Sequence, residues 1–173
     1  MKKMKIVLIE DKPEEMVRAQ RAVAGAISGT HLDIEMESFR MDMVPLEFVF
    51  ERLEAMKDTL SGVITDLHFY PRVGHSGLDL ATVRKLQQDP PPAGLAVVIW
   101  CVARGIPVVI CTDSYHHGAD VTWFNDVGLR AAFGDRGAPF SLSDACNDGG
   151  ENWNVALANL VYLVNKRNEE GAE

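Results

Sequence analysis

The chain has 173 residues, of which 47% are hydrophobic and 24% are charged, and its formal net charge is −8. These values fit one globular domain that buries its own core, and they argue against wholesale disorder. Because nucleic-acid binders present a basic surface, the acidic balance argues against that class of function.

The apolar runs of the sequence are short. The longest cover residues 94–103 and 106–111 and are separated by Arg104, whereas a membrane-spanning helix needs about 20 apolar residues. Residues 1–9 combine a basic start with too short an apolar stretch for a signal peptide. The three cysteines are widely spaced and odd in number, which favours a reducing compartment. We therefore expect a cytoplasmic protein with neither a membrane nor a nucleic acid as its partner.

The first part of the chain alternates predicted strands and helices. A strand is predicted over 5–10, a short apolar run typical of a strand buried on both faces. Residues 11–15 carry a capping carboxylate, an early proline and first-turn acids, so a helix begins here and should end near Gly29. Alternating polarity predicts a second, more exposed strand over 31–39, and helical spacing of apolar residues predicts a helix over 45–57.

The middle of the chain repeats this alternation around a long insertion. A third buried strand is predicted over 62–66, followed by a loop over 68–76 and a helix over 78–88. Three consecutive prolines interrupt the helical pattern, which resumes over 93–104. A fourth buried strand is predicted over 106–111.

The last part of the chain contains more glycine and polar residues. We predict a helix over 120–126, a short fifth strand over 130–133 and a loop over 134–150. The final helix is predicted over 153–166, and residues 168–173 read as a polar tail after a single domain over 1–167. Strands that alternate with helices in this way predict an α/β fold, with a five-stranded parallel sheet covered by helices on both faces.

Acidic residues follow three of the predicted strands. Glu10 and Asp11 end the first strand, Asp66 ends the third, and Thr112 and Asp113 follow the fourth. Because ligands of parallel sheets sit at the carboxyl ends of the strands, we expect these side chains to converge. Helix capping alone would account for Asp11 but not for Asp66, which ends an apolar strand. Clustered carboxylates favour a bound hard cation, Mg²⁺ before Ca²⁺, and the Thr112 hydroxyl can bond an oxygen of a group held by that ion.

Four segments in this order resemble the receiver domain of two-component response regulators. They are KIVLIED with its acidic pair, GVITD with its terminal aspartate, the helix start Gly77-Leu78-Asp79-Leu80, and PVVICTD with its threonine. The order of predicted elements agrees with that family from Lys5 to Lys166. The resemblance implies a flavodoxin-like (CheY-like) fold and a stand-alone signalling module of a two-component phosphorelay.

The resemblance also implies a role for each strand-end residue. Asp66 would be the phosphoacceptor, and Glu10 and Asp11 would hold Mg²⁺ together with it and with the backbone carbonyl of His68. Thr112 would contact a phosphoryl oxygen. The donor would be a phosphohistidine on a histidine kinase or phosphotransfer protein, and the chemistry is in-line phosphoryl transfer. The chain would not be an enzyme beyond this phosphoacceptor chemistry.

The sequence departs from the family pattern at the end of the expected fifth strand. Ala138 stands where the family places a lysine, and Arg136 is the nearest basic residue that could replace it. The resemblance implies that phosphorylation changes a protein–protein surface through Thr112 and an aromatic residue, here Phe133. Output would pass through a downstream protein partner, or through a homodimer formed by the last helix and the fifth strand.

Two other functions remain open from the residues. The chain could be a pseudo-receiver, an interaction module without phosphotransfer, because the expected lysine is missing. It could also be a metal-dependent hydrolase that combines the strand-end carboxylates with four loop histidines, which are His68, His75, His116 and His117.

Overall fold

The computed structural model describes residues 3–30, 32–69, 93–112, 140–143 and 152–170. Five strands form one parallel sheet in the order β2-β1-β3-β4-β5. They are β1 (Met4–Glu10), β2 (Ile34–Arg40), β3 (Gly62–Thr65), β4 (Val108–Cys111) and β5 (Phe140–Ser143). The described helices are α1 (Pro13–Thr30), α2 (Leu46–Met56), α4 (Gly94–Val102) and α7 (Trp153–Glu170). The predicted α/β class with a parallel sheet is confirmed.

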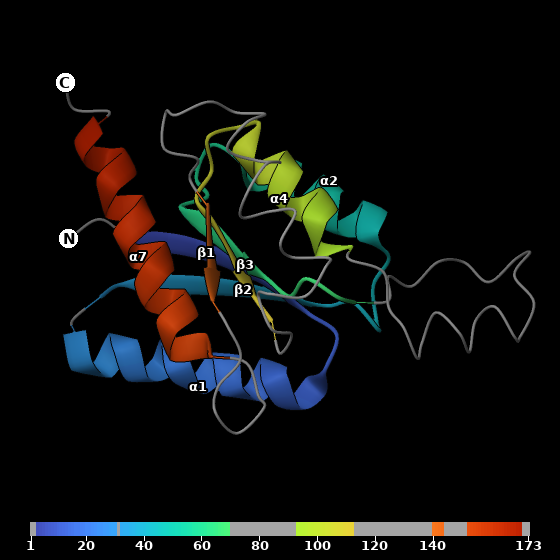
Figure 1. Ribbon diagram of the computed structural model, residues 1–173, viewed down its shortest axis with the longest axis horizontal. Helices are drawn as coiled ribbons and strands as arrows, with labels where there is room; N and C mark the ends of the chain where they lie inside the picture. Colours follow the sequence, from blue (N-terminus) through green and yellow to red (C-terminus); the bar gives the residue numbers. More distant parts are fainter. Residues whose placement is uncertain (1–2, 31, 70–92, 113–139, 144–151, 171–173) are drawn as a thin grey trace, which may run out of the picture.

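Helices cover both faces of the sheet. Figure 1 shows α1 and α7 on one side, and α2 and α4 on the other. Successive residues of a strand point to opposite faces, so β1 supplies both layers of the core. Val7 and Ile9 belong to the cluster under α2 and α4, whereas Ile6 and Leu8 belong to the cluster under α1 and α7. All four are at most 1% exposed, which explains the continuous apolar run of this strand.

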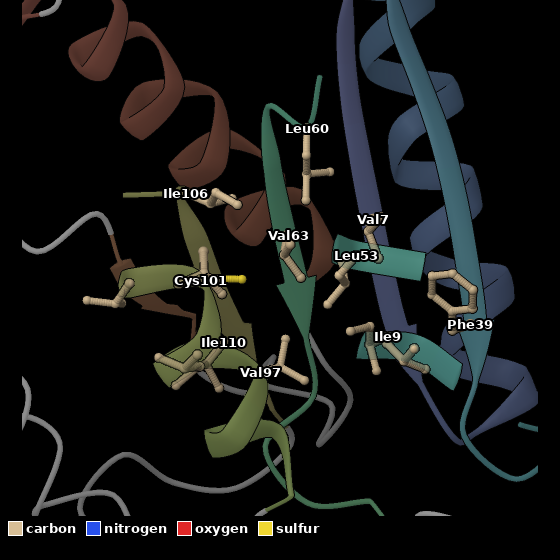
Figure 2. Close-up of a cluster of buried hydrophobic side chains, with 14 of the residues drawn as sticks. Val7, Ile9, Phe39, Leu53, Leu60, Val63, Val97, Cys101, Ile106 and Ile110 are labelled. Atoms are coloured by element: carbon tan, nitrogen blue, oxygen red, sulfur yellow. The ribbon is translucent and has the colours of Figure 1, made fainter. Parts of the chain in front are cut away.

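The core between the sheet and the α2–α4 layer is drawn in Figure 2. Strand residues such as Val63 and Ile110 pack there against Leu53 of α2 and against Val97 and Cys101 of α4. Each of these side chains is at most 1% exposed. This packing holds β3 and β4 against α2 and α4, and Asp66 and Thr112 directly follow these two strands.

The fifth strand differs from its prediction. The segment that pairs with β4 is β5, in a register that joins Val108 to Phe140 and Cys111 to Ser143. This strand lies inside the range 134–150, for which the sequence predicts a loop. Glycine and proline around the segment are typical of a loop and led to that prediction. The segment forms a strand because it pairs with β4, and a local sequence pattern does not reveal such pairing. The predicted strand over 130–133, including Phe133, lies outside the described residues.

The last helix also differs, at its carboxyl end. It continues to Glu170, four residues beyond the predicted end at Lys166, so residues 168–170 of the predicted polar tail are helical. Residues 165–170 are exposed, and an ion pair between Lys166 Nζ and Glu170 Oε1 at 3.8 Å supports the final turn. A polar helix end of this kind carries no apolar signal that a sequence reading could use.

The other described elements lie where they are predicted, with small differences at their ends. The helices predicted over 78–88 and 120–126 lie outside the described residues. Among the described helices, none combines the length and the apolar character that crossing a membrane requires.

Candidate functional site

Glu10 forms the first part of the site, at the end of β1. Its side chain is fully buried although it carries an ionisable group. Its Oε1 accepts hydrogen bonds from the backbone N–H groups of Asp11 at 2.9 Å and Lys12 at 2.8 Å. The carboxylate therefore closes the turn between β1 and α1, and its second oxygen, Oε2, is buried on the other side.

Asp66 forms the second part, directly after β3. Its backbone N–H donates to the carbonyl of Ile9 at 2.9 Å, which continues the pairing with β1 beyond the end of the strand. Its Oδ1 accepts a hydrogen bond from the Leu67 N–H at 2.6 Å. The residue is only 1% exposed, and its Oδ2 is buried without a hydrogen-bond partner in the described part of the chain. A buried carboxylate oxygen without a hydrogen-bond partner lowers the stability of the fold unless a cation or a proton binds to it.

The structure brings the predicted carboxylates together. One ligand oxygen from each of Glu10, Asp11 and Asp66 lies within 4.8 Å of the others. The neighbouring strands β1 and β3 carry these residues to the same edge of the sheet because the strands are parallel and in register. This confirms the predicted convergence for these three residues, whereas Asp113 lies outside the described residues.

The electrostatics of the cluster favour a bound positive charge. Burial, with a smaller contribution from the Asp11 charge, raises the pKa of Asp66 from 3.8 to about 7. The Lys12 charge and the hydrogen bonds from the Leu67 and His68 backbone oppose this rise in pKa. A divalent cation would stabilise the ionised form far more strongly than these groups do.

The donor set fits a hard metal ion. Three carboxylates from two adjacent turns supply only oxygen ligands, the type that Mg²⁺ and Ca²⁺ prefer. Within the described part of the chain, no group donates a hydrogen bond to the buried Oδ2 of Asp66. The buried acidic cluster can therefore bind a metal ion.

Thr112 and His68 lie at the same edge. Thr112 follows β4, the neighbour of β3, and is fully buried. His68 is half-buried, and its backbone N–H bonds the Asp66 carboxylate. Three histidines of the hydrolase hypothesis, His75, His116 and His117, lie outside the described residues.

The residue at the end of β5 is Ser143, whereas the sequence predicts Ala138 at the end of the fifth strand. Arg136 and Ala138 both precede β5 and lie outside the described residues, whereas the resemblance places a lysine at the end of the strand. Ser143 occupies that end, opposite Cys111. The described fifth strand begins at Phe140, so the role expected for Arg136 stays a prediction.

Two residues near the site were missed by sequence reasoning. Lys12 is half-buried beside the acidic pair, and its charge is the strongest influence that lowers the pKa of Asp66. Gly94, the first residue of α4, donates its N–H to the Leu67 carbonyl at 3.0 Å. A Cβ at Gly94 would lie 1.9 Å from the Asp66 carbonyl oxygen, so only glycine fits. The position of Lys12 directly after the acidic pair could have indicated that it lies near the site. No local sequence pattern indicates the importance of Gly94.

Comparisons of the chain with models of protein families, with curated proteins and with solved structures found no match.

Proposed function

We propose that the chain is a stand-alone receiver-like module that binds Mg²⁺ at Glu10, Asp11 and Asp66 and accepts a phosphoryl group on Asp66. The observation that carries the proposal is the buried Asp66 carboxylate, whose Oδ2 has no hydrogen-bond partner in the described chain and which lies beside two further carboxylates. Its place at the carboxyl edge of a parallel sheet is where such folds bind ligands. The strand order 2-1-3-4-5 supports a flavodoxin-like fold for the whole domain.

The residues of the site have distinct tasks in this proposal. The Leu67 and His68 N–H groups hold the Asp66 carboxylate in one orientation. A carboxylate oxygen attacks the phosphorus of a phosphohistidine, a P–O bond forms and the P–N bond breaks. The electron pair of that bond stays on the imidazole nitrogen of the donor, which takes up a proton. The Thr112 hydroxyl donates a hydrogen bond to a phosphoryl oxygen, and Mg²⁺ held by Glu10, Asp11 and Asp66 would neutralise charge that builds up on the group in transfer.

The partners in this proposal are proteins. A histidine kinase or a phosphotransfer protein supplies the phosphoryl group, and a downstream protein or a second copy of the chain reads the modified state. An aspartyl phosphate at this edge changes the charge and packing around β3 and β4, which is the kind of local event that biases a two-state surface.

A second candidate is a pseudo-receiver that retains the fold and binds a partner without phosphotransfer. The observation that favours it is Ser143 at the end of β5, where a receiver would present a lysine. A serine has no charge with which to balance a phosphoryl group. In this case the acidic cluster serves cation binding alone.

Intact mass spectrometry after incubation with phosphoramidate and Mg²⁺ tests the first proposal. Phosphoramidate contains the P–N bond of a phosphohistidine, so it needs no partner kinase. We expect one acid-labile phosphoryl adduct, which is absent without Mg²⁺ and absent in Asp66→Asn. Asp58→Asn is the matched control, because Asp58 is an exposed carboxylate at the other end of the sheet.

Calorimetric titration with Mg²⁺ separates the two candidates. Mg²⁺ binding with no adduct from either phosphoramidate or a panel of phosphorylated histidine kinases would favour the pseudo-receiver. If the chain neither binds Mg²⁺ nor forms an adduct, the metal and phosphotransfer proposals are both wrong.

A further inference from the structure

A shallow groove on the outer side of α2 and α4 has a composition unlike its surroundings. We call it the α2–α4 groove, and its lining consists of Glu47, Phe50, Glu51, Glu54, Ala55 and Trp100. Figure 1 shows the two helices side by side on the face of the sheet opposite α1 and α7. Phe50 and Trp100 are half-buried, because their inner parts pack on the core while their outer parts form the floor.

Three acids line this apolar floor along one face of α2. Glu47, Glu51 and Glu54 recur at helical spacing, and all three are exposed. Glu54 is neutralised by Lys57 at 2.6 Å and by Arg104 at 3.1 Å. Neither Glu47 nor Glu51 forms an ion pair with the described residues, so no side chain among these residues neutralises this end of the groove.

The end of the groove near Trp100 holds an arginine of the chain, and this arrangement indicates what the end near Glu47 can bind. The Arg104 guanidinium lies 4.3 Å from the centre of the Trp100 ring and also contacts Glu54. A cation held between an aromatic face and a carboxylate is a favourable arrangement for arginine. Phe50 beside Glu47 and Glu51 offers the same pair of groups, and no cation of the described residues pairs with these two acids.

We propose that the α2–α4 groove docks a basic amphipathic helix of a partner protein. Apolar side chains of that helix rest on Phe50 and Trp100, and its Lys or Arg side chains pair with Glu47 and Glu51. A space between two helices suits a helix, which presents apolar anchors at three- and four-residue spacing. The net charge of −8 repels a second copy of the chain and attracts a basic partner. This docking does not depend on phosphorylation of Asp66.

Binding of a model peptide tests the proposal on the full chain. The probe is a fluorescein-labelled amphipathic peptide of leucine and lysine, compared with one peptide in which glutamate replaces lysine and one in which serine replaces leucine. Fluorescence anisotropy should detect binding of the first peptide only, because both charge and apolar contact are needed. In nitrogen–proton correlation spectra, the Trp100 indole signal should shift while that of buried Trp153 stays in place.

A charge-reversal pair identifies the docking site. The double variant Glu47→Lys, Glu51→Lys changes only exposed residues, and we expect it to bind the peptide at least about tenfold more weakly. The control is Glu169→Lys, Glu170→Lys, which changes the net charge equally at the exposed end of α7 and should keep wild-type affinity. The proposal is overturned by equal losses in the two variants, by no binding of the first peptide, or by spectral changes confined to α1 and α7.

Discussion

At the scale of single residues, Asp66 is the residue on which most of the proposed chemistry depends. Its burial raises the pKa to about 7, so near neutral pH the folded chain holds a proton that the unfolded chain releases. Above pH 7 the carboxylate is charged and buried beside Asp11 and Glu10. This electrostatic cost destabilises the metal-free fold, and a bound cation would relieve it.

The pH dependence of stability follows from the sign of this shift. Between the unfolded pKa of 3.8 and the folded pKa of about 7, only the folded chain keeps the proton on Asp66, so the free energy of unfolding falls as pH rises. The loss through this window is on the order of 4 kcal/mol. We expect Asp66→Asn to abolish that part of the loss, so that its advantage over the wild type grows from pH 4 to pH 7 and then levels off.

Urea unfolding in a metal-chelating buffer at several pH values measures this difference. Asp58→Asn provides the comparison, because it removes an exposed carboxylate. A constant difference between Asp66→Asn and the wild type across the pH range would contradict the raised pKa of Asp66.

Lys12 provides the second prediction at this scale. Its charge is the largest influence that opposes the rise in the pKa of Asp66. We expect Lys12→Gln to raise that pKa above about 7 and to slow phosphorylation by phosphoramidate, because less of the carboxylate is then ionised at neutral pH. Carbon-13 spectra of the carboxyl group give the pKa directly. Lys57→Gln removes a lysine that pairs with Glu54 and should leave the Asp66 titration unchanged.

At the scale of elements, the contact of α4 with the end of β3 is the tightest constraint near the site. Gly94 lets the first turn of the helix approach the Asp66 carbonyl, where a Cβ would lie 1.9 Å from the oxygen. We expect Gly94→Ala to lower the free energy of unfolding by at least about 3 kcal/mol, since the backbone of either α4 or the Asp66 segment must move.

Gly25→Ala is the control for this substitution. Gly25 lies inside α1 and a Cβ there meets no atom within 4 Å. Alanine at that position should stabilise the chain by about 0.5–1 kcal/mol, because it restricts the unfolded chain without a clash. Thermal unfolding of the two variants should therefore shift in opposite directions. A Gly94→Ala variant as stable as the wild type would contradict the close contact between the start of α4 and the Asp66 carbonyl.

The elements that sequence analysis predicted correctly are those with a strong local signal. The apolar run of β1 and the capped start of α1 define their own positions, and with them the acidic pair at the β1–α1 turn. The segment Phe140–Ser143 alternates apolar and polar residues, a period that could have indicated a strand had the surrounding glycines not favoured a loop. Gly94 could not have been singled out, because its importance arises from a contact with Asp66, which lies 28 residues away in the sequence.

At the scale of the whole molecule, binding at the acidic cluster is linked to folding. The residues that form it come from β1 and from the end of β3, so the unfolded chain does not present the cluster. A cation that binds only the folded state stabilises it by about 2.7 kcal/mol at a concentration one hundred times the dissociation constant. Mg²⁺ should therefore raise the unfolding midpoint of the wild type.

The linkage predicts that Mg²⁺ reduces the stability advantage of Asp66→Asn over the wild type. Without the ion, the charged Asp66 lowers the free energy of unfolding above pH 7, so we expect the variant to be the more stable protein. With Mg²⁺ at one hundred times the dissociation constant, the same charge is a ligand, so the wild type should gain about 2.7 kcal/mol and recover most of its deficit of about 4 kcal/mol. Unfolding curves at pH 8 with Mg²⁺, and with NaCl of equal ionic strength, measure both cases. Equal stabilisation of both proteins by Mg²⁺ would indicate screening of the net charge of −8 instead of binding at the cluster.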